Sequence, residues 1–95
     1  MKFEWDAKKN EANKNRYGIS FEEAQTAFDD PLHLSKLDKR FNYFEERWIT
    51  IGATSKQKII LVAHLYFFEC GEEVIRIISA RKAISKERKQ YGTYE

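Results

Sequence analysis

Two consecutive apolar segments dominate this sequence and limit the folds open to it. Ile59–Phe68 and Val74–Ala80 are almost continuously apolar, and a short polar stretch around Glu69–Glu72 joins them. Runs of this length, rich in β-branched and aromatic residues and joined by a glycine-containing turn, predict two neighbouring antiparallel strands. Because their apolar residues do not alternate with polar ones, we expect both strands to be central and covered on two faces.

The first part of the chain predicts a short strand followed by a helix. Phe3–Asp6 has the pattern of an entry strand. The Asp6 carboxylate is then placed to accept hydrogen bonds from free backbone N–H groups one turn on. The helix should cover residues 7–16 and end near Gly18, a residue type that often ends helices.

A second helix is expected directly afterwards. Ser20 and Glu23 have capping-box spacing, in which the hydroxyl accepts from the Glu23 N–H and the Glu23 side chain reaches back to Ser20. Apolar residues then recur at helical spacing from Phe21 to Phe28. Pro31 ends this helix, because proline disfavours helical geometry in the residue before it.

The chain changes to strand patterns from Leu32 onward. Strands are expected at Leu32–Leu37 and at Arg47–Ile51, with a connecting loop over residues 41–44. A final basic helix should follow over residues 86–91, capped by Ser85. Helices first and consecutive strands afterwards predict an α+β fold with a small, mainly antiparallel sheet. Two N-terminal helices and a short C-terminal helix would pack against this sheet.

Length and cysteine content favour one soluble domain. A chain of 95 residues is expected to form a single domain, residues 1–95, with 42% hydrophobic residues to build a core. Cys70 is the one cysteine, which excludes an internal disulfide and fits a reduced, cytoplasmic setting. The N-terminus is charged, and the longest apolar stretch is too short to span a bilayer. We therefore expect no association with a membrane.

The distribution of charge is more informative than the total. The net charge is +2, but residues 74–95 carry six basic and two acidic side chains. This imbalance indicates a polyanion-binding surface over Val74–Tyr91. The alternative, which stays open, is that solvated lysine and arginine side chains only keep a small domain soluble. The sequence has neither paired metal-ligand spacing nor a phosphate-binding glycine loop, so no metal or cofactor is expected.

Basic and aromatic side chains are the remaining candidates for chemistry. Attack of a ribose 2′-OH on its neighbouring phosphate needs an acid, a base and fixed positive charge, and arginine suits the phosphate because its planar fork donates two parallel hydrogen bonds. The candidates for catalysis are Arg47, His64, Arg76, Arg81 and Tyr91. The candidates for RNA binding are Lys14, Lys82, Lys86, Arg88 and Lys89.

Two of these assignments depend on geometry. His64 is the best acid or base by intrinsic pKa, but a hydrogen-bonded structural histidine is at least an equal alternative at this apolar position. Arg76 and Arg81 point to opposite faces of a regular strand. They share a site only if the chain bends or bulges near Ser79–Ala80.

The chain contains a series of motifs in a specific order, namely Phe3–Asp6, Asn13, Gly18–Ala24, Asp29–Pro31, Glu46–Arg47, Ile51–Gly52, His64, Gly71–Glu73, Ile75–Ala83 and Glu87–Arg88. Taken together, these motifs resemble the BrnT family, the toxin half of BrnT/BrnA toxin–antitoxin pairs. This resemblance implies a RelE-like fold and a metal-independent ribonuclease that inhibits translation. It also implies a BrnA-type antitoxin partner, which binds DNA and represses the shared operon, in a complex of two toxins and two antitoxins. Family members often carry histidine where this chain has Tyr17.

Two other functions remain open at the level of sequence. The first is a non-enzymatic or degenerate binding module that acts only through its antitoxin complex, as a co-repressor. A protein that binds its partner and leaves RNA intact would fit it. The second is a DNA-binding regulator, which is weaker because the chain has no convincing helix-turn-helix and the basic helix is short.

Overall fold

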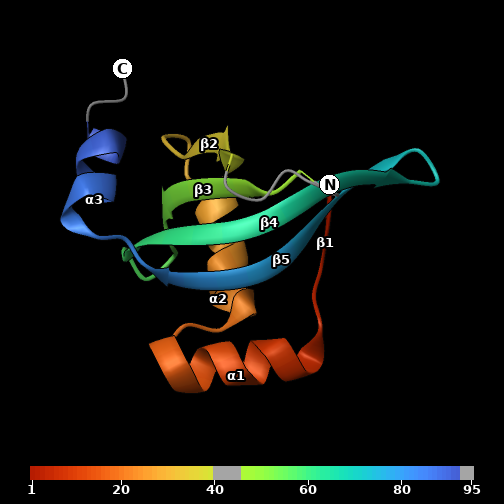
Figure 1. Ribbon diagram of the computed structural model, residues 1–95, viewed down its shortest axis with the longest axis horizontal. Helices are drawn as coiled ribbons and strands as arrows, with labels where there is room; N and C mark the ends of the chain where they lie inside the picture. Colours follow the sequence, from red (N-terminus) through yellow and green to blue (C-terminus); the bar gives the residue numbers. More distant parts are fainter. Residues whose placement is uncertain (40–45, 93–95) are drawn as a thin grey trace.

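The computed structural model describes residues 1–39 and 46–92, so the loop expected over residues 41–44 lies outside the described residues. The described part is an α+β fold built on one mixed sheet (Figure 1). In chain order its elements are β1 (Lys2–Glu4), α1 (Ala7–Tyr17), α2 (Phe21–Gln25), the 3₁₀ helix η1 (Thr26–Asp29), β2 (Leu34–Leu37), β3 (Trp48–Ala53), β4 (Ile59–Glu69), β5 (Glu72–Lys82) and α3 (Ser85–Gly92).

The sheet has five strands in the order β1-β5-β4-β3-β2. The two strands expected to be central, β4 and β5, form a long antiparallel hairpin, and β3 and β2 continue the antiparallel pairing. The edge strand β1 is parallel to β5, with Phe3 beside Ile75. The expected cover on both faces is wrong for the face opposite the core, where Ala63, Leu65 and Phe67 of β4 are only half-buried. At the projecting tip of the hairpin Phe68 is 75% exposed.

The hydrophobic core lies between one face of the sheet, here called the core face, and the segment that leads into and through α2. Every residue of the central cluster is at most 1% exposed. Its members are Ile19, Phe21, Ala24 and Ala27 from the helical side, with Ile60, Val62, Ile75, Ile77 and Ala80 from β4 and β5. The opposite face of the sheet is here called the outer face, and α2 does not cover it. The helix α3 lies at one end of the sheet (Figure 1).

A β-bulge in β5 changes which side chains share the outer face. The partners of the adjacent β4 residues Ala63 and His64 lie two residues apart on β5, which leaves Ile78 as the extra residue. Side chains alternate between faces along a regular strand, so one extra residue reverses the alternation. Arg76 and Arg81 therefore both point to the outer face.

Asn13 of α1 is bonded to the backbone beside this bulge. Its amide donates to the carbonyl oxygens of Ile19 (2.9 Å) and Ala80 (2.8 Å), and its side-chain oxygen accepts from the Ala80 N–H (3.1 Å). β1 pairs with β5 only as far as Arg76, so Ala80 lies beyond the parallel pairing. One buried side chain thus satisfies both backbone groups that the edge of β5 leaves unpaired there.

The boundaries of the first two helices follow the expected capping with one exception in the second helix. Asp6 accepts from Lys8 N (2.8 Å) and Lys9 N (3.2 Å), and Gly18 has a φ of 73° at the end of α1. Ser20 Oγ accepts from Glu23 N (3.0 Å), as predicted. The predicted second helix divides into α2 and η1 before Pro31.

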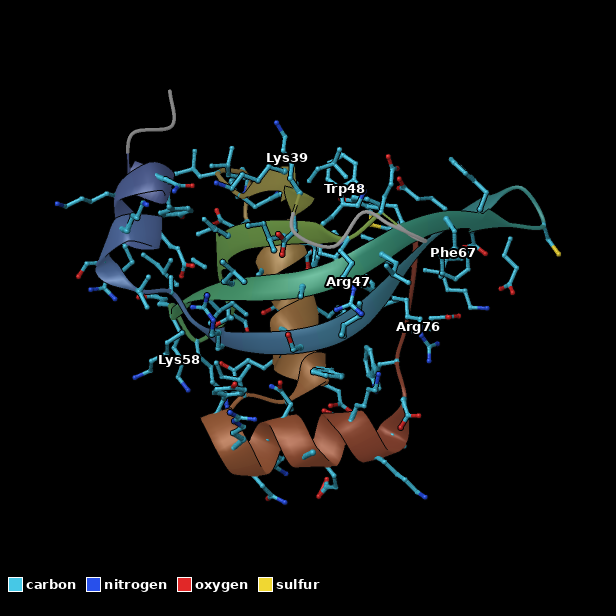
Figure 2. The ribbon with its side chains drawn as sticks, in the orientation of Figure 1. Lys39, Arg47, Trp48, Lys58, Phe67 and Arg76 are labelled. Atoms are coloured by element: carbon cyan, nitrogen blue, oxygen red, sulfur yellow. The ribbon has the colours of Figure 1, made fainter. Side chains whose placement is uncertain are left out.

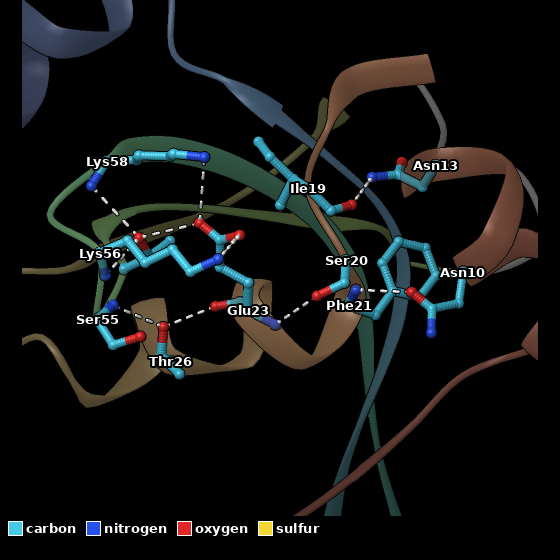
Figure 3. A network of polar contacts seen from close by, with 11 residues as sticks. Asn10, Asn13, Ile19, Ser20, Phe21, Glu23, Thr26, Ser55, Lys56 and Lys58 are labelled. Carbon is cyan, nitrogen blue, oxygen red and sulfur yellow. Dashed lines mark hydrogen bonds and ion pairs between the residues drawn. The ribbon is translucent and has the colours of Figure 1, made fainter. Parts of the chain in front are cut away.

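The exception is the Glu23 carboxylate, which faces the β3–β4 turn instead of Ser20 (Figure 3). It lies 3.7 Å from the ammonium groups of both Lys56 and Lys58 and accepts a long hydrogen bond from Thr54 (3.4 Å). Two cations brought close by the fold compete with one backbone N–H for a charged acceptor, and charge-assisted contacts are the stronger ones.

Candidate nucleic-acid interface

A cleft of about 600 Å³ opens between the outer face of the sheet and α3. Its floor is apolar, from β3 and β4, and its rim is charged, from β2, β5 and α3. The lining residues are Lys36, Leu37, Asp38, Lys39, Ile49, Ile51, Leu61, Arg81, Ile84, Lys86, Glu87 and Gln90. The lining has four cationic side chains and two carboxylates, so the cleft carries a net positive charge, which attracts a polyanion.

Arg81 is the most firmly oriented cation of the cleft. Its two terminal nitrogens donate to the two carboxylate oxygens of Glu87, each at 2.9 Å. The same carboxylate accepts from the Ile84 N–H (2.9 Å), which joins the first turn of α3 to the end of β5. α3 therefore begins one residue before the expected boundary, and Glu87 supplies the hydrogen bond at its start. Ser85, the expected cap, instead accepts from the Arg88 guanidinium (3.3 Å).

The Arg81–Glu87 pair also fixes the charge of the carboxylate. The hydrogen bonds from Arg81 lower the pKa of Glu87, and the Ile84 N–H acts in the same direction, against a smaller rise from burial. Glu87 is therefore a carboxylate at neutral pH, and its role is to hold the guanidinium fork and not to donate a proton.

Two cations of the cleft, Lys36 and Lys39, were not among the residues expected from the sequence. Lys36 pairs with Ile49 on the outer face and donates to Gln90 of α3 (2.8 Å). Both lysines lie in the acidic middle of the sequence, so the charge distribution gave no sign of them. Strand alternation was the signal that could have indicated Lys36. Lys36 lies two residues after Leu34 on β2, so both side chains point to the same face of the sheet.

Arg76 and Arg47 do not line the cleft. Arg76 donates to Glu4 of β1 (2.9 Å) at the far side of the outer face from α3. Arg47 directly precedes β3, where Trp48 pairs with His64. Both are labelled over the same half of the sheet in Figure 2. The bulge thus places Arg76 and Arg81 on one face, but Arg81 alone reaches the cleft.

His64 lies in the core and is 0% exposed. Its Nε2 makes a 2.7 Å hydrogen bond with Thr50, and its ring packs edge-on against Phe28 (5.0 Å) and Tyr66 (4.9 Å). Burial is the main cause that lowers the pKa of His64 to about 4. The neutral ring therefore predominates at neutral pH, on the opposite side of the sheet from the cleft.

This low pKa predicts a loss of stability in acid. The unfolded chain takes up a proton at His64 near pH 6.5 and the folded chain only near 4, so protonation favours unfolding. The contribution of neutral His64 to the free energy of unfolding should be fully present above pH 6.5. It should fall by about 3 kcal/mol as the pH drops toward 4. Urea denaturation of the wild type and of His64→Gln across this range measures the difference. Equal pH slopes for the two proteins would contradict the assignment.

Tyr91 connects α3 to the rest of the molecule. Its hydroxyl donates to Asp30 (2.7 Å), which also accepts from the Ala53 N–H (2.8 Å) at the end of β3. The hydrogen bond to Asp30 is the main cause that raises the pKa of Tyr91, so the phenol remains protonated at neutral pH. Tyr91 lies outside the cleft lining and anchors the helix that forms one of its walls.

The five expected RNA-binding residues divide among four places. Lys86 lines the cleft, whereas Lys82 and Arg88 line a smaller cavity beside the start of β4. Lys89 is exposed on α3, and Lys14 is exposed on α1, which packs under the sheet. Within residues 1–39 and 46–92, no three acidic, histidine or cysteine side chains are grouped to hold a metal ion. No helix in that part of the chain is long and apolar enough to cross a membrane.

The sequence and the fold both match ribonuclease toxins of type II toxin–antitoxin systems. Residues 5–87 match the family described as "Ribonuclease toxin, BrnT, of type II toxin-antitoxin system". The chain therefore belongs to the BrnT family. The crystal structure of the Brucella abortus ribonuclease toxin BrnT is similar, with a TM-score of 0.60 and 25% identity over 90% of this chain and 99% of that one. A search of curated protein sequences gave no match.

Proposed function

We propose that this chain is a metal-independent endoribonuclease of the RelE-like kind, which cleaves RNA in the cleft between the outer face and α3 and thereby inhibits translation in the cytoplasm. The observation that supports this most is the set of four cations around one concave apolar floor in a member of a ribonuclease toxin family. Positive charge with an apolar surface suits a single strand, whose phosphates and bases both need contacts.

Arg81 is the proposed centre of the chemistry. When a ribose 2′-oxygen forms its bond to the neighbouring phosphorus, negative charge accumulates on the phosphoryl oxygens before the bond to the 5′-oxygen breaks. The 2′-OH loses its proton and the departing 5′-oxygen gains one. A guanidinium already oriented by Glu87 stabilises that charge without reorganising. Lys36, Lys39 and Lys86 then hold the flanking phosphates.

The remaining candidates receive supporting roles in this proposal. Arg76 and Arg47 extend the basic outer face beyond the cleft and contact RNA away from the cleaved bond. His64 stabilises the core beneath β4, and Tyr91 holds α3 in place through Asp30. The family position that is often histidine is Tyr17 here, and this side chain is 40% exposed on α1, away from the cleft. The presence of tyrosine instead of histidine at this position therefore leaves the proposed site intact.

A type II toxin requires a protein antitoxin, and we propose a BrnA-type protein in this role. Two toxins and two antitoxins would form the complex, and the antitoxin would supply the contacts to operator DNA. Covering the basic cleft would neutralise the toxin directly. The mass of the co-expressed pair in solution tests the stoichiometry, and a one-to-one heterodimer would overturn it.

The direct test is cleavage of a defined RNA by the purified chain with excess EDTA present. Cleavage should continue at an unchanged rate, and the co-purified antitoxin should suppress it. Inducible expression should arrest growth and degrade RNA only when the neighbouring antitoxin reading frame is absent. A chain that binds its antitoxin tightly, leaves RNA intact and permits growth would instead be the non-enzymatic binding module.

A further inference from the structure

A second, smaller cavity of about 300 Å³ lies beside the corner where β5 leads into α3. Three of its five lining residues are cations, and none is acidic. The lining consists of Gln57, Lys58, Ile59, Lys82 and Arg88. Its cations come from three separate parts of the fold, namely the entry to β4, the end of β5 and α3. Lys58 is labelled at this corner in Figure 2.

This cavity and the cleft lie on opposite sides of one strand end. Lys82 pairs with Ile60 on the core face, whereas its neighbour Arg81 pairs with Leu61 on the outer face. α3 contributes to both places, with Glu87 in the cleft and Arg88 in the cavity. A chain of phosphates that leaves Arg81 can therefore continue around the corner and meet positive charge again.

The cations of the cavity are arranged to receive an anion. The Arg88 guanidinium is held by hydrogen bonds to the Ala83 carbonyl (2.8 Å) and to Ser85 Oγ (3.3 Å). A guanidinium has five N–H donors, so donors remain for a ligand. The Glu23 carboxylate lies 3.7 Å from both Lys58 and Lys56 and partly neutralises them, so Lys82 and Arg88 supply the net positive charge for a ligand. The Lys82 ammonium has no ion-pair or hydrogen-bond partner within the described part of the chain.

We propose that this cavity is a second phosphate-binding subsite, which holds the backbone of the RNA substrate on the far side of β5 from the cleaved bond. The proposal rests on the ribonuclease function proposed above and extends its substrate to a single strand longer than the cleft alone accommodates. RNA is favoured over an acidic peptide because Ile59 is the sole apolar residue of the lining, and peptide-binding sites are centred on apolar anchors. Phosphate also matches the combination of a planar guanidinium and an ammonium.

The test compares two double variants that remove the same charge. Lys82→Gln/Arg88→Gln changes the cavity, and Lys8→Gln/Lys9→Gln removes two exposed lysines that line neither the cavity nor the cleft. Lys82→Gln alone is a third variant, which breaks no hydrogen bond or ion pair between described residues and is therefore expected to fold. The probes are fluorescein-labelled 2′-O-methyl RNAs of about four and about twelve nucleotides, which lack the attacking hydroxyl. Anisotropy titrations over a range of salt concentrations give Kd and its salt dependence.

The cavity variant should bind the long probe about 10-fold more weakly, with a salt slope lower by about 1.4 for two lost phosphate contacts, and bind the short probe unchanged. For Lys82→Gln, which removes one phosphate contact, the salt slope should decrease by about 0.7, half as much as for the double variant. With cleavable RNA, KM for the long substrate should rise about 10-fold while kcat stays constant. Equal losses in the cavity and control variants, or an equal loss on the short probe, would overturn the subsite.

The outcome for the subsite is separate from the outcome for the ribonuclease. The 2′-O-methyl probes report binding whether or not the protein cleaves RNA. Wild-type protein that cleaves nothing would end the proposed activity, yet the probes would still show whether the cavity holds phosphate. A cavity variant that loses antitoxin affinity but keeps RNA affinity would identify a protein contact and overturn the proposal.

Discussion

Replacing Arg81 by alanine should lower kcat for RNA cleavage about 100- to 1,000-fold, the cost of removing one preoriented group that stabilises transition-state charge. KM should change little, because the three lysines of the cleft still bind the phosphates. Single-turnover cleavage of a defined RNA measures the effect, and growth after induction reports it in cells. Arg81→Lys should recover little, since an ammonium cannot reproduce the two-pronged contact that Glu87 orients.

Two variants separate this role from simple loss of charge. Arg76→Ala removes an arginine from the same face of the same strand, but one that pairs with Glu4 outside the cleft, and should cost less than about 10-fold. Glu87→Gln keeps an acceptor for the Ile84 N–H and loses the charge that holds the guanidinium, so kcat should fall at unchanged stability. Equal effects of Arg76→Ala and Arg81→Ala would show that the cleft is not the site of cleavage.

The largest effect on stability should come from Asn13→Ala. The substitution removes three buried hydrogen bonds and leaves the N–H and carbonyl of Ala80 without partners. Buried backbone groups left unpaired cost about 1–3 kcal/mol each, so the variant should lose about 3 kcal/mol or more and melt roughly 10–20 °C lower. Asn15→Ala is the matched control, since Asn15 is exposed on the same helix and should melt like the wild type.

This prediction also links stability to the site. Asn13 bonds the backbone one residue before Arg81, on the strand whose bulge turns Arg81 to the outer face. Below its melting temperature, Asn13→Ala should therefore also cleave RNA more slowly than Asn15→Ala does. Thermal unfolding followed by circular dichroism gives the first effect and cleavage at low temperature the second. A melting temperature equal to that of the control would contradict the role of Asn13.

Much of the fold could be read from the sequence because local rules decided it. Asp6, Ser20 and Gly18 act at the helix ends as their positions predict. The apolar runs form β4 and β5, and the meander through β3 is antiparallel. The parallel β1 was beyond local rules, because its partner Val74 lies more than seventy residues along the chain. The Glu23 carboxylate was misplaced for the same reason, since its lysines are distant in sequence.

The candidate site was less accessible to sequence reasoning. Charge distribution drew attention to the segment from Val74 to Tyr91, which supplies Arg81 and Lys86 to the cleft. It missed Lys36 and Lys39, because local charge counts cannot show which lysines a sheet brings together. It also could not choose between the two roles of His64, since burial of a histidine depends on what packs against both sides of its strand.

The sequence by itself determined the helix ends, the long hairpin, the basic C-terminal segment and the family, because each depends on residues close together in the chain or on their order. Only the tertiary structure decided that Arg76 and Arg81 share a face. That result depends on one extra residue, Ile78, in the pairing of two strands. A bulge is stable when the unpaired backbone beside it finds other partners, and here Asn13, sixty-seven residues away from Ala80, provides them.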